Sequence, residues 1–163
     1  SLLIVLPGLV SQVSVPILSS ELAKKNYDGI KKIVYLSFKI ILIVVTPLIV
    51  VGSIFSKNLM LIYGGSFGAG WIVMIFSLFT AGVMAMISPV GAIINAFGKM
   101  WSGFALNIGW ASVFIGLTWF LGRHFGAVGV AGSRLFAYSL HFIWTSFYIV
   151  FFLRKQMRNG SIE

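Results

Sequence analysis

The sequence predicts an all-α integral membrane protein, a polytopic bundle of about five transmembrane helices. Of its 163 residues, 59% are hydrophobic and 9% are charged, whereas soluble domains carry about 25% charged residues. A soluble domain of this size could not bury so much apolar surface. The apolar residues also form long continuous runs, and a helix needs about 20 of them to cross the hydrocarbon core. These observations exclude a soluble enzyme, a disordered tail and a coiled coil.

Five apolar runs have the length of a span or nearly so. The first run begins at Ser1 and shows neither the basic leader nor the cleavage motif of a signal peptide. We therefore expect residues 1–163 to form a single membrane domain that is truncated at its N-terminus. The predicted spans lie at residues 1–18, 33–55, 71–97, 100–121 and 128–153.

Basic residues gather on one side of this predicted bundle. Lys57 and Arg123 lie on the other side, in predicted outer loops over residues 56–70 and 122–127. The positive-inside rule places the basic side, with loops 19–32 and 98–99 and the tail 154–163, in the cytoplasm. The prediction is thus a multi-pass protein of the plasma membrane with a cytoplasmic C-terminus. The basic side carries Lys24, Lys25, Lys31, Lys32, Lys99, Arg154, Lys155 and Arg158.

Polar side chains inside the spans indicate a candidate site. Polar groups within a membrane are costly unless they face protein or water. The last span carries a stripe at helical steps of three and four residues, from Arg134 to Tyr148. A weaker stripe in the third span ends at Asn95, and Lys39 lies within the second. We therefore predict a cationic, hydrogen-bonding cavity whose substrate-pathway candidates are Lys39, Asn95, Arg134, Tyr138, His141 and Thr145.

Each candidate also has a purely structural interpretation. Lys39 and Arg134 lie about two turns from the span ends, so their side chains can extend to the membrane interface. His141 can serve as a hydrogen-bonded packing residue. Asn95 and Asn107 can link neighbouring helices by hydrogen bonds. The outer loop has its own prediction, a short amphipathic interfacial helix over residues 57–63.

Catalytic chemistry has no support in the sequence. No acidic residue lies within a predicted span, cysteine is absent, and the two histidines lie far apart along the predicted topology. We therefore predict no catalytic residue, no metal site and no cofactor. The formal net charge of +9 follows the membrane topology, so no nucleic-acid partner is expected. The protein is predicted not to be an enzyme.

Several short motifs resemble one family in their order and spacing. The chain resembles the C-terminal part of bacterial polysaccharide repeat-unit flippases of the O-antigen type, in the multidrug/oligosaccharidyl-lipid/polysaccharide exporter superfamily. The resemblance covers nearly the whole chain. It rests on Val15-Pro16-Ile17-Leu18-Ser19, Thr46-Pro47-Leu48, the Leu61–Phe67 loop, Asn95-Ala96-Phe97-Gly98-Lys99, and the Gly-x-x-Gly-x-Ala pattern within Phe125–Ala131.

The resemblance implies a twelve-helix transporter in two lobes, of which this chain would hold helices eight to twelve. The missing N-terminal lobe would then be its partner within the same protein. Such flippases move undecaprenyl-diphosphate-linked oligosaccharides across the bacterial inner membrane by alternating access, for the biosynthesis of lipopolysaccharide and other surface polysaccharides. The implied partners are the lipid-linked oligosaccharide and membrane lipids. Lys39 and Arg134 are compatible with a cationic cavity that accepts the diphosphate.

Other functions are also compatible with the sequence. The same fold could carry a peptidoglycan lipid precursor or a drug, although a cationic drug would favour acidic cavity residues. A membrane-embedded glycan polymerase would need longer loops than those predicted. A membrane subunit that transports nothing is the last alternative, and the polar stripe of the last span argues against it.

Overall fold

The computed structural model describes residues 2–160, and all regular structure among them is helical. The architecture is therefore all-α. The elements in chain order are α1 (Leu2–Ala23), α2 (Tyr27–Ile54), α3 (Ser56–Ile62), the short 3-10 helix η1 (Gly65–Gly70), α4 (Trp71–Ala96) and α5 (Met100–Gly160).

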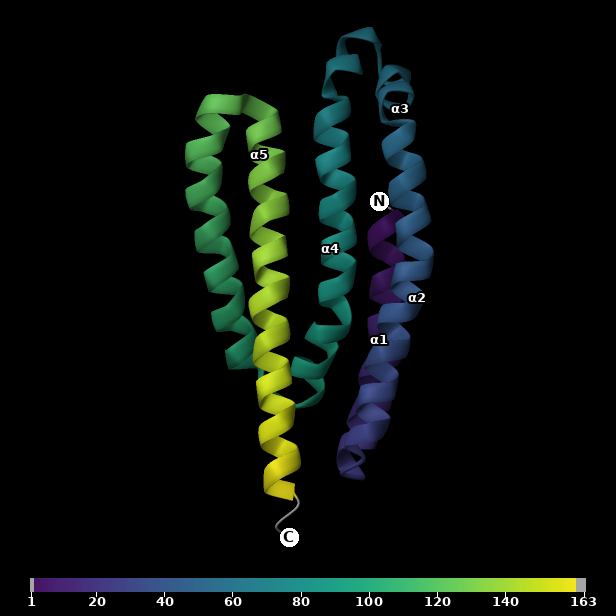
Figure 1. Ribbon diagram of the computed structural model, residues 1–163, viewed down its shortest axis with the longest axis vertical. Coiled ribbons are helices and arrows are strands. Elements are labelled where there is room, and N and C mark those ends of the chain that lie inside the picture. Colours follow the sequence, from purple (N-terminus) through teal and green to yellow (C-terminus); the bar gives the residue numbers. More distant parts are fainter. Residues whose placement is uncertain (1, 161–163) are drawn as a thin grey trace.

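Helix α4 is the centre of the bundle and contacts α1, α2 and α5 (Figure 1). Its second half is almost continuously apolar, which suits a helix surrounded by others. The main core cluster joins Val90 and Ile93 of α4 to Leu18 of α1, Ile30 of α2 and Ile149 of α5. The other faces of the helices leave many large apolar side chains exposed. That pattern is expected of helices whose outer surface meets lipid.

The α1–α2 connection is a short polar turn. The side chain of Asn26 caps α2 by accepting a hydrogen bond of 3.0 Å from the Gly29 amide, and its amide donates to Glu21 Oε2 at 2.6 Å. This cap starts α2 earlier than the predicted span, so the predicted loop 19–32 is reduced to residues 24–26. Two exposed ion pairs flank the turn: Lys24–Glu21 at 3.4 Å and Lys31–Asp28 at 3.1 Å.

Helix α5 is a hairpin of two antiparallel arms, as Figure 1 shows. Gly126 breaks the helix with φ 56° and ψ −135°, a backbone conformation that glycine adopts without a steric penalty. At Gly129 the carbonyl oxygen of Leu121 occupies the place where a Cβ would be. The two glycines of the Gly-x-x-Gly pattern therefore make the tight hairpin possible. Residues 100–125 are called the first arm and residues 127–160 the second arm.

Among the described residues, three helices are long and apolar enough to cross a membrane: Tyr27–Ile54, Gly65–Ala96 and Met100–Gln156. These three helices contain most of four predicted spans, because Met100–Gln156 includes both arms of α5 and therefore two of the spans. The predicted span 1–18 falls on α1, which is not among the three. Ser1, which begins that span, and residues 161–163, which end the predicted tail, lie outside the described residues.

The connections lie alternately at the two ends of the bundle. The α1–α2 turn, the α4–α5 turn and the C-terminal end of α5 share one end in Figure 1, and α3, η1 and the bend of α5 share the other. The predicted outer loop is mostly helical, and its predicted short helix is present as α3, shifted by one residue. We call the end with the α1–α2 and α4–α5 turns the basic end, because eight of the twelve Lys and Arg residues lie in or near its segments.

Candidate functional site

A cavity of about 210 Å³ lies between α4 and the two arms of α5. We call it the polar cavity, because each wall contributes hydrogen-bonding side chains. Its apolar walls come from Ile87, Ile94 and Leu106. The other lining residues are Gly91 and Asn95 of α4, Gly103 and Asn107 of the first arm, and His141 and Thr145 of the second arm.

His141 lies on the buried side of this cavity, with only 6% of its surface exposed. The indole Nε1 of Trp144 donates a hydrogen bond of 2.9 Å to His141 Nδ1. An indole N–H can only donate, so Nδ1 must present its lone pair and the neutral ring carries its proton on Nε2. This contact fixes the tautomer and makes His141 a hydrogen-bond donor through Nε2–H.

Thr145 stands one turn further along the second arm and is 2% exposed. Its hydroxyl has no hydrogen-bond partner among the described residues. A buried hydroxyl without a partner costs about 1–3 kcal/mol. Elsewhere in the helices, hydroxyls bond to the carbonyl four residues earlier, at Ser77, Thr80, Ser112, Ser133 and Ser139. Four buried hydroxyls lack a partner among the described residues, those of Ser53, Thr118, Thr145 and Ser146, and of these four only Thr145 lines the polar cavity.

Two asparagines complete the polar lining. Asn107 Nδ2 donates to the Gly103 carbonyl of its own helix at 3.0 Å, which leaves its Oδ1 as an acceptor. Asn95 lies in the last turn of α4. Both asparagines are exposed, whereas His141 and Thr145 are buried, so the cavity has an open rim and a buried floor. From the sequence, Asn107 was expected to link helices rather than to bind a substrate; its spacing of four from Gly103 places both residues on one helix face.

The other predicted site residues lie outside the polar cavity. Arg134 is exposed, donates from Nη2 to Met84 Sδ at 4.0 Å and lies 5.9 Å from the ring centroid of Tyr138. The Tyr138 ring is 4.8 Å from that of Trp110. No carboxylate lies within ion-pair distance of Arg134 in the described part of the chain. Lys39 is exposed on α2.

The predicted stripe of the last span is therefore divided by the structure. His141 and Thr145 line the polar cavity with Asn95, while Arg134 and Tyr138 form a cation–aromatic cluster closer to the bend of α5. Within the part of the chain that the structure describes, no charged side chain lines the polar cavity. The cavity is thus a neutral hydrogen-bonding site, and the predicted cations are separate from it.

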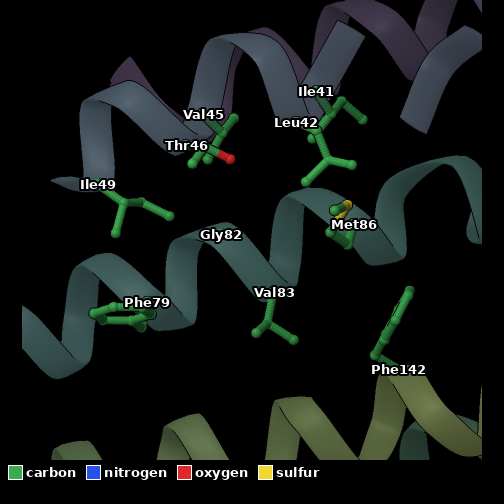
Figure 2. A pocket seen from close by; sticks show the side chains of 10 residues that line it. All are labelled: Ile41, Leu42, Val45, Thr46, Ile49, Phe79, Gly82, Val83, Met86 and Phe142. Atoms are coloured by element: carbon green, nitrogen blue, oxygen red, sulfur yellow. The ribbon is translucent and has the colours of Figure 1, made fainter. Parts of the chain in front are cut away.

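A second cavity, of about 220 Å³, lies between α2 and α4 and reaches Phe142 of α5 (Figure 2). We call it the apolar cavity. Figure 2 shows α4 with Phe79, Val83 and Met86 between the α2 side chains and Phe142. The hydroxyl of Thr46 is the single polar side-chain group on its lining.

No protein-family model, curated protein or solved structure matches this chain. Among residues 2–160 no group of three or more His, Cys, Asp or Glu side chains could hold a metal ion. Function is therefore inferred from the polar cavity, the apolar helices around it and the distribution of charge.

Proposed function

We propose that this chain is the C-terminal part of a flippase that exports undecaprenyl-diphosphate-linked oligosaccharide repeat units. The observation that carries the proposal is the polar cavity between α4 and α5. Its two amides, one imidazole N–H and one free hydroxyl are the neutral groups that bind sugar hydroxyls by hydrogen bonds.

The position of the cavity supports loading from the cytoplasm. Asn95 and Gly103 lie on either side of the turn at Gly98, so the cavity is close to the basic end of the bundle. Under the positive-inside rule that end faces the cytoplasm, where the lipid-linked oligosaccharide begins its transfer. The C-terminus would then be cytoplasmic, in the inner membrane of a bacterium.

The rest of the proposed transporter follows from the resemblance of the motifs. In the twelve-helix protein, α1, α2, α4 and the two arms of α5 would supply five spans of the second lobe. Arg134, which has no acidic partner in the described residues, would meet the diphosphate. A cation in a membrane span is stabilised by an anionic ligand that offsets its desolvation. Lys39 is the second cation of the proposed pathway.

The test is complementation in a bacterium that lacks its own repeat-unit flippase. The complete protein containing this chain is expected to restore surface polysaccharide and to reduce the accumulated lipid-linked oligosaccharide. The matched control is the same protein with His141→Phe and Asn95→Leu together, checked for equal abundance in the membrane. Failure of the unmodified protein to restore the polysaccharide, while it is present in the membrane, would refute the proposal. Rescue of a strain depleted of its peptidoglycan precursor flippase would instead assign a different cargo.

A further inference from the structure

We propose that the polar cavity binds one neutral sugar residue of the cargo and not its diphosphate. This inference rests on the proposed function and assigns a part of the cargo to the cavity. The binding groups are the hydroxyl of Thr145, the Nε2–H of His141 and the side-chain amides of Asn95 and Asn107. The sugar would bind at the basic end of the bundle, away from the Arg134 cluster.

The size of the cavity fits a single ring. A volume of about 210 Å³ equals the space of about seven water molecules at ~30 Å³ each, which is close to the volume of one pyranose. The open rim at Asn95 and Asn107 leaves room for the rest of an oligosaccharide to extend out of the cavity. The apolar side chains of Ile87, Ile94 and Leu106 supply a surface for the C–H groups of a sugar ring, as in other small-molecule sites.

The charge of the cavity excludes the diphosphate. No Lys or Arg lines it, and moving an anion into a cavity without a cation carries a large desolvation cost. A sugar hydroxyl or acetamido group has no such cost, because it both donates and accepts hydrogen bonds. The lining likewise offers both donors and acceptors: His141 Nε2 donates, Asn107 Oδ1 accepts, and the Thr145 hydroxyl can do both.

The free hydroxyl of Thr145 is the second observation that indicates a ligand. A buried threonine can satisfy its hydroxyl within its own helix, as Thr80 does by donating to the Phe76 carbonyl at 2.7 Å. Thr145 is equally buried, at 2% exposure; the residue lines the cavity, and its buried hydroxyl has no partner among the described residues. A bound sugar would supply the missing partner.

The experiment measures binding of N-acetylglucosamine to the purified complete protein by saturation-transfer NMR. Thr145→Val keeps the shape of the side chain and removes the hydroxyl, so it should weaken binding by about three- to tenfold. Thr145→Ser should restore binding. The control is Thr118→Val, because Thr118 also has a buried hydroxyl without a partner but lies in an apolar groove near the bend of α5. Inorganic pyrophosphate should not displace the sugar.

Two results would overturn the proposal. One is that the unmodified protein, Thr145→Val and Asn95→Leu all bind the sugar with equal affinity. Asn95→Leu is included because Asn95 is exposed, so its substitution does not disturb the buried core. The other is displacement of the sugar by pyrophosphate. Export measured in parallel separates the two proposals. If the protein exports the cargo but does not bind the sugar, the flippase proposal stands and the sugar subsite is refuted. If sugar binding depends on Thr145 but nothing is exported, the subsite stands and the flippase proposal is refuted.

Discussion

The two cavities beside α4 have nearly equal volumes, about 210 and 220 Å³, and opposite linings. The apolar cavity of Figure 2 exposes aliphatic and aromatic side chains, with Thr46 as its one hydroxyl. Lipid chains can fill such a space without any polar partner. The polar cavity contains amide, imidazole and hydroxyl groups, which in a membrane need hydrogen-bonding partners. Of these two spaces of similar size, the polar one offers hydrogen-bonding side chains from each of its walls.

The difference between the cavities arises along α4 itself. Phe79, Val83 and Met86 border the apolar cavity, whereas Gly91 and Asn95 border the polar one. Pro89 lies between the two sets and is buried within the helix. A proline inside a helix removes one backbone hydrogen bond and bends the helix axis, and Figure 1 shows α4 bent in its second half. The bend coincides with the change from a lipid-like lining to a polar one.

The largest expected effect comes from breaking the hairpin that forms two walls of the polar cavity. Gly129→Ala places a methyl group where the Leu121 carbonyl oxygen lies, so the arms must separate. Overpacking costs ~1–3 kcal/mol even when side chains can adjust, and here the obstacle is backbone. The thermal midpoint and membrane abundance of the complete protein should fall strongly. Gly132→Ala, on the same arm with nothing within 4 Å of the added carbon, is the control. Equal stability of the two variants would contradict the described hairpin.

A pair of filling substitutions tests the contrast between the cavities directly. At Gly91 an added Cβ meets nothing within 4 Å, so Gly91→Leu should place its side chain in the polar cavity. Export is expected to fall by more than about tenfold, equivalent to about 1.4 kcal/mol. Val83→Phe fills the apolar cavity and should leave export unchanged. An equal loss in both variants, at equal abundance, would mean that the two cavities do not differ in function.

Arg134→Ala tests whether the cation outside the polar cavity serves the same cargo. Hydrogen bonds to charged groups contribute about 1.5–3 kcal/mol, and the lower end is expected for an exposed residue, so export should decrease by about tenfold while abundance is unchanged. Arg123→Ala is the matched control, since that guanidinium stacks 4.3 Å from the Trp119 ring centroid near the bend of α5. Unchanged export in Arg134→Ala would remove Arg134 from the pathway.

The smallest expected effect concerns the bond that orients His141. Trp144→Phe removes the indole donor to His141 Nδ1 and so frees the imidazole to change its tautomer. A neutral hydrogen bond contributes about 1 kcal/mol, which corresponds to a decrease in export of at most about fivefold. Trp101→Phe serves as control, because Trp101 is 85% exposed. If the two variants export equally, Trp144 does not position His141 for the cargo.

Hydropathy and turn residues were enough to predict where the long helices lie but not where they end, because residues 122–125 and 154–160, predicted as loop and tail, are helical in α5. The charge-free runs became α4 and the first arm of α5, and the predicted turns at Gly98 and Gly126 both have positive φ, of 64° and 56°. The α1–α2 turn was predicted too long, because the capping of α2 by Asn26 extends the helix into a polar segment. Helix caps and turns depend on residues that are close in the sequence, so most helix positions can be predicted from a single sequence.

The composition of the site could not be predicted in the same way. Spacing placed Arg134, His141 and Thr145 on one face of one helix, but the cavity depends on which residues of α4 and the first arm lie opposite. Asn107 joins the lining because the hairpin brings its helix beside the second arm. Arg134 remains outside because the stripe extends beyond the cavity. Which residues meet in the cavity depends on the packing of helices that are distant in the sequence.

The central position of α4 also orders the biosynthesis of the protein. Helices α1 and α2 contact each other, and both contact α4, which a ribosome adds only after α3 and η1. The core around Leu18 and Ile30 therefore stays incomplete until α4 enters the membrane. The arms of α5 are joined by a tight bend, a local contact that forms quickly. A nascent chain would thus first complete its α1–α2–α4 unit, and the polar cavity would exist only after the last hairpin had docked.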